Sequence, residues 1–256
     1  MRSSGSEVSP SARRAQSSAR PQRLGLFGGS FNPIHNGHLA IARQAHEILK
    51  LDRTLFIPTG DPPHKQDGAL AAAQHRLEMV RLAISGTPAF ELSDIEVTRQ
   101  GKSYSIDTVR ELQQRYGPAA TLFFLIGLDA FLDLPNWREP DALLAACSFV
   151  VISRPGQSFT ALATLPFLRN LPTDKLMALD AGQLNRLDLP LPSGQALICL
   201  ALKPSPISAS DIRQRIQRGA LLANLLPPPV ESYILDRKST RLNSSHVSES
   251  RMPSSA

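Results

Sequence analysis

The chain has 256 residues, of which 42% are hydrophobic, and it carries a formal net charge of +6 at pH 7. At this length one large domain or two small ones can bury a sizeable core. Residues 1–23 hold five arginines against one glutamate, and residues 237–256 hold four basic residues against one glutamate. Because the remaining 19 basic and 20 acidic residues nearly cancel, the sequence argues against nucleic-acid binding through a basic face of the folded part.

Membrane-spanning and secreted proteins are also excluded by the sequence pattern. No apolar run approaches the roughly 18 to 20 residues that cross a bilayer, and the first twenty residues lack the apolar core of a secretory signal. Cys147 and Cys199 lie in apolar runs without CxxC spacing. This favours buried thiols in a reducing compartment over a disulfide or a metal pair, so we expect a cytoplasmic protein without a membrane partner.

The predicted elements alternate along the chain between two disordered ends. Residues 1–22 lack periodicity and are expected to be disordered, whereas residues 239–256 change composition abruptly and are interpreted as a non-native or disordered tail. Strands are predicted at 24–27, 54–58, 90–97, 121–127, 149–153 and 197–202, and helices at 39–51, 74–84, 105–116, 141–146, 209–218 and from 229 onward.

This alternation predicts an α/β fold in a single domain over residues 23–238. The expected architecture is a doubly wound, mostly parallel sheet with helices on both faces. The segment 121–127 is the most continuous apolar run and suits a central strand that is covered on both sides. The stretch 59–68 is interpreted as a loop, and the Leu- and Pro-rich stretch 157–195 gives no clear pattern.

The strongest functional signal is the segment 28–38, GGSFNPIHNGH, between the first strand and the first helix. Ligands of open α/β sheets bind outside the carboxyl ends of strands. The glycines let the backbone approach a ligand closely, and the start of the helix offers N–H groups and partial positive charge to an anion. His35 and His38 can then face the same phosphate; the alternative is a turn with two capping histidines.

Further candidate residues follow later strands. Ser208 and Ser210 precede a helix and can receive phosphate oxygens together with Arg213, or Ser208 can simply cap that helix. Asp129 follows the central strand and is either a ribose or amide contact or a helix N-cap. Trp137, the single tryptophan, either stacks on a planar ring or packs in its loop.

Lys65 and Arg138 either add positive charge near a phosphate or are solvated side chains. The other histidines at 46, 75 and 246 lack any partner pattern and are interpreted as structural or exposed.

These segments resemble the nucleotidyltransferase superfamily that carries an (H/T)xGH motif, and within it the bacterial nicotinate-nucleotide adenylyltransferase family. The resemblance rests on GGSFNPIHNGHL at 28–39, PPHK at 62–65, SYSIDT at 103–108, GLDA and NWR within 127–138 with RPG at 154–156, and ISASDIR at 207–213. Two departures stand out, because Ser105 replaces the more usual Thr and Ala209-Ser210 replaces Ser-Thr.

The resemblance implies transfer of AMP from ATP to nicotinate mononucleotide, which gives deamido-NAD and pyrophosphate. It implies His35 and His38 as catalytic residues and Mg²⁺ that arrives bound to ATP. The implied ATP contacts are Gly28, Gly29, Ser30, Phe31, His35, His38, Gly127, Asp129, Ser208, Ser210 and Arg213. The implied nicotinate mononucleotide contacts are Ser30, Phe31, Lys65, Thr108, Asp129, Trp137 and Arg154.

Two alternatives remain at this point. An adenylyltransferase of the same superfamily could act on nicotinamide mononucleotide or on phosphopantetheine. A basic nucleic-acid-binding protein would need a basic face within residues 24–236, where the charges nearly cancel. The sequence fixes neither the selectivity between acid and amide nor the oligomeric state.

Overall fold

The computed structural model describes residues 21–63, 70–203 and 205–237. The expected disordered ends therefore lie almost entirely outside the described residues, as does Lys65. The elements follow in chain order: β1 (Arg23–Gly29), α1 (Asn36–Leu49), β2 (Arg53–Pro58), α2 (Ala73–Ile84), β3 (Phe90–Leu92), α3 (Ile95–Thr98), α4 (Ser105–Tyr116), β4 (Thr121–Gly127), α5 (Leu128–Leu132), η1 (Leu134–Asn136), α6 (Pro140–Ala146), β5 (Ser148–Ile152), η2 (Phe159–Thr164), α7 (Thr173–Asp180), β6 (Arg186–Pro190), β7 (Ala196–Leu200) and α8 (Ala209–Arg218).

The strands form one seven-stranded sheet in the order β3-β2-β1-β4-β5-β7-β6. All neighbours pair in parallel except β6, which runs antiparallel to β7 at one edge. The chain leaves β1 towards β2 and later returns to β4 on the other side of β1. The strand order therefore reverses between β1 and β4, and the doubly wound, mostly parallel fold is confirmed.

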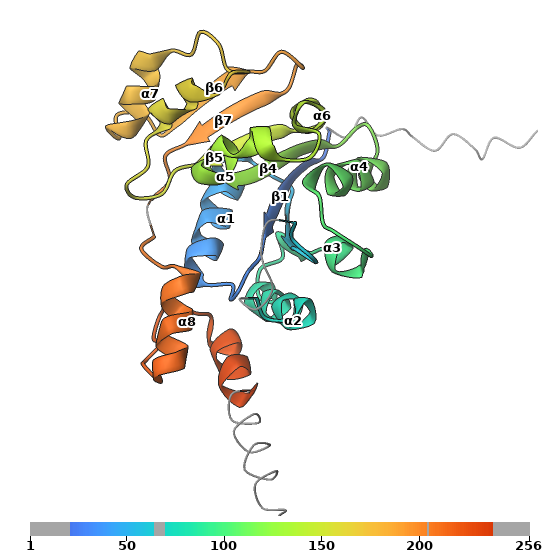
Figure 1. The fold of residues 1–256 in the computed structure, drawn as a ribbon, viewed down its shortest axis with the longest axis vertical. Helices are drawn as coiled ribbons and strands as arrows, with labels where there is room; N and C mark the ends of the chain where they lie inside the picture. The colour runs from blue at the N-terminus through green and yellow to red at the C-terminus, as the bar shows by residue number, and fades with distance from the viewer. Residues whose placement is uncertain (1–20, 64–69, 204, 238–256) are drawn as a thin grey trace, which may run out of the picture.

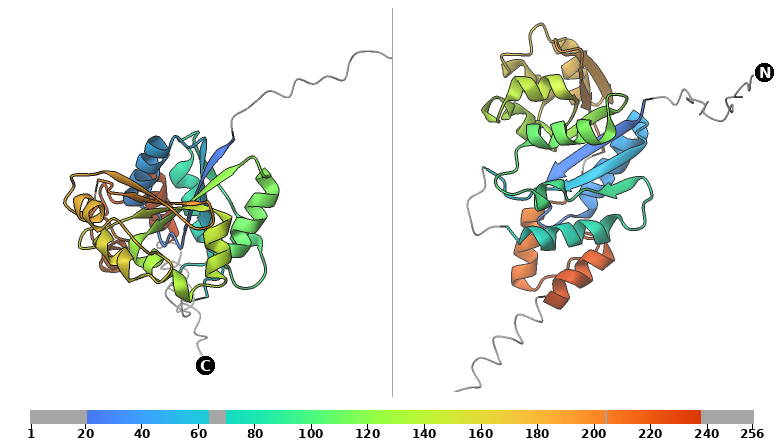
Figure 2. Two further views of the ribbon diagram at one scale, coloured as in Figure 1. Left: turned by 90° about the horizontal axis from the view of Figure 1, so that it is seen from above. Right: turned by 90° about the vertical axis from the view of Figure 1, so that its right-hand side faces the viewer.

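Two apolar clusters cover the two faces of the sheet because buried side chains alternate along each strand. Leu26 and Phe124 belong to the cluster that packs against α4, α5 and α6, whereas Phe27 and Leu125 belong to the cluster under α1, α2 and α8. Figure 1 shows α7 beside β6 and β7, far from α8 and the helix at 228–237, and Figure 2 shows the layers from two other directions.

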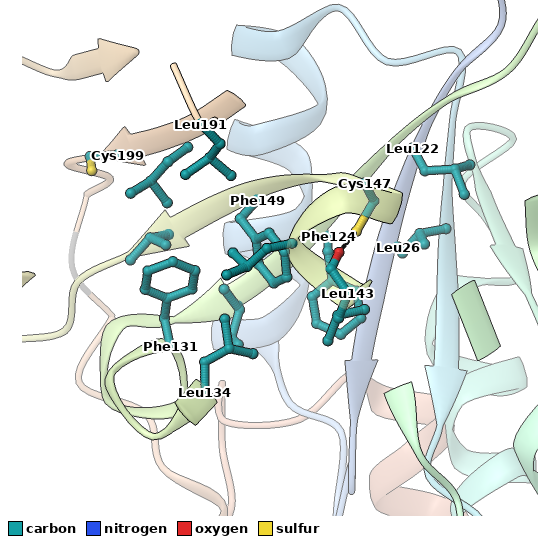
Figure 3. Packing of buried hydrophobic residues seen from close by; sticks show 14 of the residues in the cluster. Leu26, Leu122, Phe124, Phe131, Leu134, Leu143, Cys147, Phe149, Leu191 and Cys199 are labelled. Atoms are coloured by element: carbon teal, nitrogen blue, oxygen red, sulfur yellow. Dashed lines mark hydrogen bonds between the residues drawn. The ribbon is translucent and has the colours of Figure 1, made fainter. Parts of the chain in front are cut away.

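The interior of the first cluster is built from aromatic rings and aliphatic side chains (Figure 3). Phe149 contacts Phe124 and Phe131 at ring-centroid distances of 5.5 Å and 5.3 Å. Cys147 and Cys199 are both free and buried, as expected. Burial raises the pKa of each thiol to about 12, so both stay protonated at neutral pH.

The structure corrects the predicted strand at 90–97. β3 ends at Leu92, and the chain then turns into the short helix α3, whose residues Val97 and Thr98 both donate N–H bonds to the carbonyl of Asp94. The alternating apolar pattern wrongly indicated a strand, because Ile95 is buried as part of a helical turn. The unassigned stretch 157–195 holds η2, α7 and β6, and the segment after β4 holds α5 and η1.

No helix in residues 21–63, 70–203 and 205–237 is long and apolar enough to cross a membrane.

Candidate active site

A cavity of about 840 Å³ lies at the carboxyl ends of the parallel strands, on both sides of the point where the strand order reverses. Open α/β sheets bind ligands at this point because the loops after neighbouring strands diverge there. The structure brings most of the predicted residues to its wall: Gly28, Gly29, Ser30, Phe31, His35, His38, Gly127, Asp129, Trp137, Arg138, Arg154, Ser208, Ser210 and Arg213.

His35 and His38 form a stacked pair of imidazoles at the start of α1. Their ring centroids are 3.7 Å apart, and the planes differ by 28°. The backbone N–H of His35 donates to Nδ1 of His38 over 3.2 Å. Because Nδ1 accepts this bond, the neutral His38 ring carries its proton on Nε2 and is available there as a hydrogen-bond donor.

Both imidazoles are held in the neutral form. Burial, with a smaller contribution from the charge of Arg154, lowers the pKa of His35 to about 4. Burial also lowers the pKa of His38 well below its usual value, with smaller contributions from His35 and Arg154. Arg154 therefore lies close enough to act on both histidines, and the pair offers N–H donors to an anion without carrying charge of its own.

Phe31 lines the cavity but contributes mainly support. Its ring is 2% exposed and packs edge-on against Phe27 and His38, at centroid distances of 5.7 Å and 5.2 Å. Its backbone has a φ of 42°, a conformation that is uncommon for a residue with a bulky side chain. The buried ring thus braces the His38 imidazole, so a ligand can meet the Phe31 backbone more readily than the ring.

The start of α1 is partly occupied already. Asn36 donates its backbone N–H to Leu225 and its side-chain amide to Asn224, both over 2.9 Å. One of the expected anion donors is therefore used to anchor the C-terminal segment. At the next residue, a Cβ atom on Gly37 would lie 2.8 Å from the hydroxyl of Ser205 and 3.0 Å from Nδ1 of His35, which explains why glycine is required there.

The start of α8 meets the loop after β1 through Arg213. Its Nη1 donates to the carbonyl of Asn32 over 2.8 Å, and its Nη2 donates to the hydroxyl of Ser210 over 3.1 Å. Ser208 caps the helix, because its hydroxyl accepts from the Asp211 N–H at 3.1 Å. The capping alternative for Ser208 is thus confirmed, and Arg213 keeps further guanidinium donors beyond these two bonds.

An aromatic wall lies on the other side of the cavity. The indole N–H of Trp137 donates to Asp133 over 3.3 Å, and the indole ring packs edge-on against Phe124. Next to it, the guanidinium of Arg138 lies 4.6 Å from the centre of the Tyr104 ring. The N-cap alternative for Asp129 is wrong, because Gly127 is the N-cap of α5 and Asp129 lies within its first turn.

Thr108 was expected to contact nicotinate mononucleotide, but the structure places it outside the cavity wall. It is buried, does not line the cavity, and its hydroxyl donates to Oε1 of Glu96 over 2.8 Å while it accepts from Arg99 over 3.0 Å. The helix α4 turns Thr108 inward, so its hydroxyl serves Glu96 instead of a ligand. Lys65 lies outside the described residues.

Several residues of the wall escaped the sequence analysis. Glu96 is 8% exposed, and burial raises the pKa of its carboxyl group despite hydrogen bonds from Thr108, Ser103 and Gly60. Because residues 90–97 were predicted to form a strand, Glu96 was not recognised as part of the cavity wall. Lys203 and Ser205 also line the cavity after the last parallel strand, where the rule on strand ends could have found them.

The cavity wall has more basic than acidic side chains, whereas the charges of the whole folded part nearly cancel. Among the described residues that line the cavity, the basic side chains are those of Arg138, Arg154, Lys203 and Arg213, and the acidic ones are those of Glu96 and Asp129. A chain that is nearly neutral between its ends therefore concentrates positive charge where a polyanion would bind. The sequence totals could not reveal this local excess.

Residues 26–215 match the cytidylyltransferase-like family model. A protein of Citrifermentans bemidjiense, named a probable nicotinate-nucleotide adenylyltransferase, is 43% identical over 217 residues, which is 84% of this chain and 97% of that protein. A protein of Moorella thermoacetica with the same name is 36% identical over 85% of this chain and 91% of its own length.

Among solved structures, Plasmodium falciparum nicotinic acid mononucleotide adenylyltransferase complexed with NaAD matches with a TM-score of 0.62 and 18% identity. The match covers 84% of this chain and 96% of that one, and it supports the fold.

Acidification should destabilise the fold through the histidine pair. Below pH 6.5 the unfolded imidazoles bind protons, whereas folded His35 stays neutral down to a pKa of about 4. The free energy of unfolding should therefore fall, by about 1.4 kcal/mol per pH unit for each buried imidazole, as the pH drops through this window. Urea unfolding between about pH 7.5 and about pH 4.5 measures the slope. The double variant His35→Asn, His38→Asn should flatten it; an unchanged slope would contradict the assignment.

Proposed function

The chain belongs to the nicotinate-nucleotide adenylyltransferases within the cytidylyltransferase-like family, and on this basis we propose that it transfers AMP from ATP to nicotinate mononucleotide. The products are deamido-NAD, a precursor in NAD synthesis, and pyrophosphate. A phosphate oxygen of the mononucleotide forms a bond to the α-phosphorus of ATP. The bond from that phosphorus to the β-phosphate oxygen breaks, and pyrophosphate leaves with the electron pair.

The observation that carries the proposal is the stacked, neutral histidine pair on the wall of a cavity that also holds a second helix start and an aromatic wall. Phosphoryl transfer needs little covalent work from a protein, because its barrier is lowered mainly by positioning two substrates and by stabilising charge on the transferring phosphate. The cavity offers N–H donors and cations on one side and flat rings on the other, which suits a triphosphate beside a pyridine.

His38 is the best candidate to stabilise the transition state. Its Nδ1 is used by the backbone of His35, so Nε2 is the atom that donates. A neutral donor can strengthen its bond as negative charge grows on the transferring phosphate. The backbone around Gly28–Phe31 and the residues Ser210 and Arg213 would hold the ATP phosphates, together with Asp129 on the opposite strand end.

The pyridine nucleotide would occupy the aromatic wall. Trp137 would offer a ring face for stacking, Arg154 lines the same cavity close to the histidines, and Ser30 and Phe31 would offer backbone contacts. Mg²⁺ would enter with ATP and neutralise phosphate charge. Asp129 gives the cavity one carboxylate for such a complex, which fits a metal that keeps phosphate and water ligands.

The cytoplasmic location that the sequence pattern indicates stays a prediction.

Release of pyrophosphate from purified protein tests the function directly. ATP and Mg²⁺ are supplied with nicotinate mononucleotide, nicotinamide mononucleotide or phosphopantetheine in separate reactions. We expect the highest kcat/KM with nicotinate mononucleotide. Preference for either of the other acceptors would reassign the substrate within the superfamily, and absence of turnover with all three would refute adenylyl transfer.

Replacement of His38 should abolish most of the turnover. His38→Ala removes the Nε2 donor, and loss of one such donor lowers kcat by about 100-fold or more. His46→Ala is the matched control, because His46 lies on the same helix and its Nδ1 is 3.3 Å from Thr54 Oγ1, outside the cavity. Circular dichroism checks that both variants fold. A His38→Ala enzyme with nearly wild-type kcat would remove His38 from the mechanism.

Arg138 should favour the acid over the amide. Its guanidinium lies beside the aromatic wall, and its ion-pair distances to Asp107 and Glu139 are 4.0 Å and 3.7 Å, so it retains donors for an incoming carboxylate. Arg138→Gln should raise KM for nicotinate mononucleotide about fivefold and leave that for nicotinamide mononucleotide unchanged.

Arg115→Gln is the matched control for Arg138→Gln. The Arg115 side chain is 53% exposed, against 51% for Arg138, and it pairs with Glu111 at 3.7 Å away from the cavity. Equal changes in KM for acid and amide in the Arg138 variant would contradict a role in selectivity.

A further inference from the structure

Arg76 on α2 is a buried cation directly behind the cavity. Its side chain is 1% exposed, and it does not belong to the cavity wall. The guanidinium donates to three backbone carbonyls: Nη1 to Ser30 over 2.9 Å, Nη2 to Gly60 over 3.1 Å and Nε to Ala71 over 2.9 Å. Burial of a cation costs free energy unless its donors are satisfied. The three hydrogen bonds offset this cost, and they also hold the three segments together.

The three carbonyls belong to segments that are far apart in sequence. Ser30 follows β1 and lies on the wall with the histidines, whereas Gly60 follows β2. Ala71 precedes α2, and its N–H donates to the side chain of Asn32 over 3.1 Å. Since the carbonyl of Asn32 accepts from Arg213 on α8, Arg76 is linked through Ala71 to the second helix start of the site.

Gly60 connects Arg76 to the opposite wall. Its carbonyl accepts from Arg76, and its N–H donates to the carboxyl group of Glu96, which lines the cavity. A Cβ atom at Gly60 would lie 2.0 Å from the backbone oxygen of Glu96. Gly60 in the loop after β2 is therefore held between a buried cation and a buried carboxyl group, and there is no space for a side chain at this position.

A planar guanidinium is needed for this geometry. Its fork directs three N–H groups to three acceptors at once, whereas a lysine ammonium is a point charge on a flexible stem. Lysine at this position could keep the charge and one or two of the bonds. It could not hold the loops after β1 and β2 in the same mutual orientation.

We propose that Arg76 is a positioning residue for adenylyl transfer, which fixes the wall around Ser30 and the histidines at a set distance from the wall around Gly60 and Glu96. The proposal rests on the proposed function, because alignment matters only for two substrates that react with each other in this cavity. Small errors in the alignment of two reactants lower the rate strongly even when each reactant still binds. Loss of Arg76 should therefore affect kcat more than the affinity for either substrate alone.

The test compares Arg76→Lys and Arg76→Ala with the wild type. Calorimetry gives Kd for ATP and for nicotinate mononucleotide separately, and pyrophosphate release gives kcat. We expect kcat to fall about tenfold or more in Arg76→Lys and further in Arg76→Ala, while each Kd changes less than about threefold. Added guanidinium should restore part of kcat in Arg76→Ala by occupying the vacated position. If Arg76→Ala does not fold, Arg76→Lys, which retains the charge, decides the question.

Leu176→Ala is the control for a purely structural effect. Leu176 is fully buried on α7, at the end of the molecule remote from the cavity, so its loss should lower Tm without changing kcat. An Arg76→Lys enzyme with wild-type kcat, or one in which both Kd values rise as much as kcat falls, would overturn the proposal. Absence of turnover in the wild type would instead refute the proposed function, and this inference with it.

Discussion

The burial of two adjacent imidazoles in the neutral state is the constraint on which the site depends. With ring centroids 3.7 Å apart, His35 and His38 cannot both become charged without strong repulsion. Phe27 and Phe31 keep water from one side of the His38 ring, and Arg154 adds a positive potential. In the proposed reaction, the apolar core under α1 would therefore support catalysis, because it maintains the neutral state in which the rings could donate to a phosphate.

The site is assembled from both ends of the folded chain. The first strand and helix supply the histidines, but the segment that follows β7 completes their surroundings through Ser205 and Arg213, and Asn36 is anchored to Leu225. The donors that a helix start would offer to an anion are thereby divided between ligand binding and tertiary contacts. The remaining donors act beside a local excess of basic side chains on the cavity wall, so the site can attract polyanions although the folded part is nearly neutral.

The parts of the site that depend on local geometry could be predicted from the sequence. The segment from Gly28 to His38 contains its own strand end, turn and helix start, so both the position and the pairing of the histidines followed from spacing. Thr108 and Glu96 were misplaced or missed because their roles depend on how the helices α3 and α4 rotate against the sheet. The role of Arg76 depends on three loops that come together in the folded protein. The periodicity of a sequence predicts single helices and strands, but it does not predict which distant loops come together.

The buried cysteines have a practical consequence for experiments on this protein. Thiols react with maleimides and iodoacetamide as thiolates, and burial keeps Cys147 and Cys199 both inaccessible and protonated. The native protein is therefore a low-background scaffold for site-directed labelling. A single cysteine introduced on the cavity rim, for example at Ser105, would carry a fluorophore or spin label alone and report the approach of the two substrates in real time.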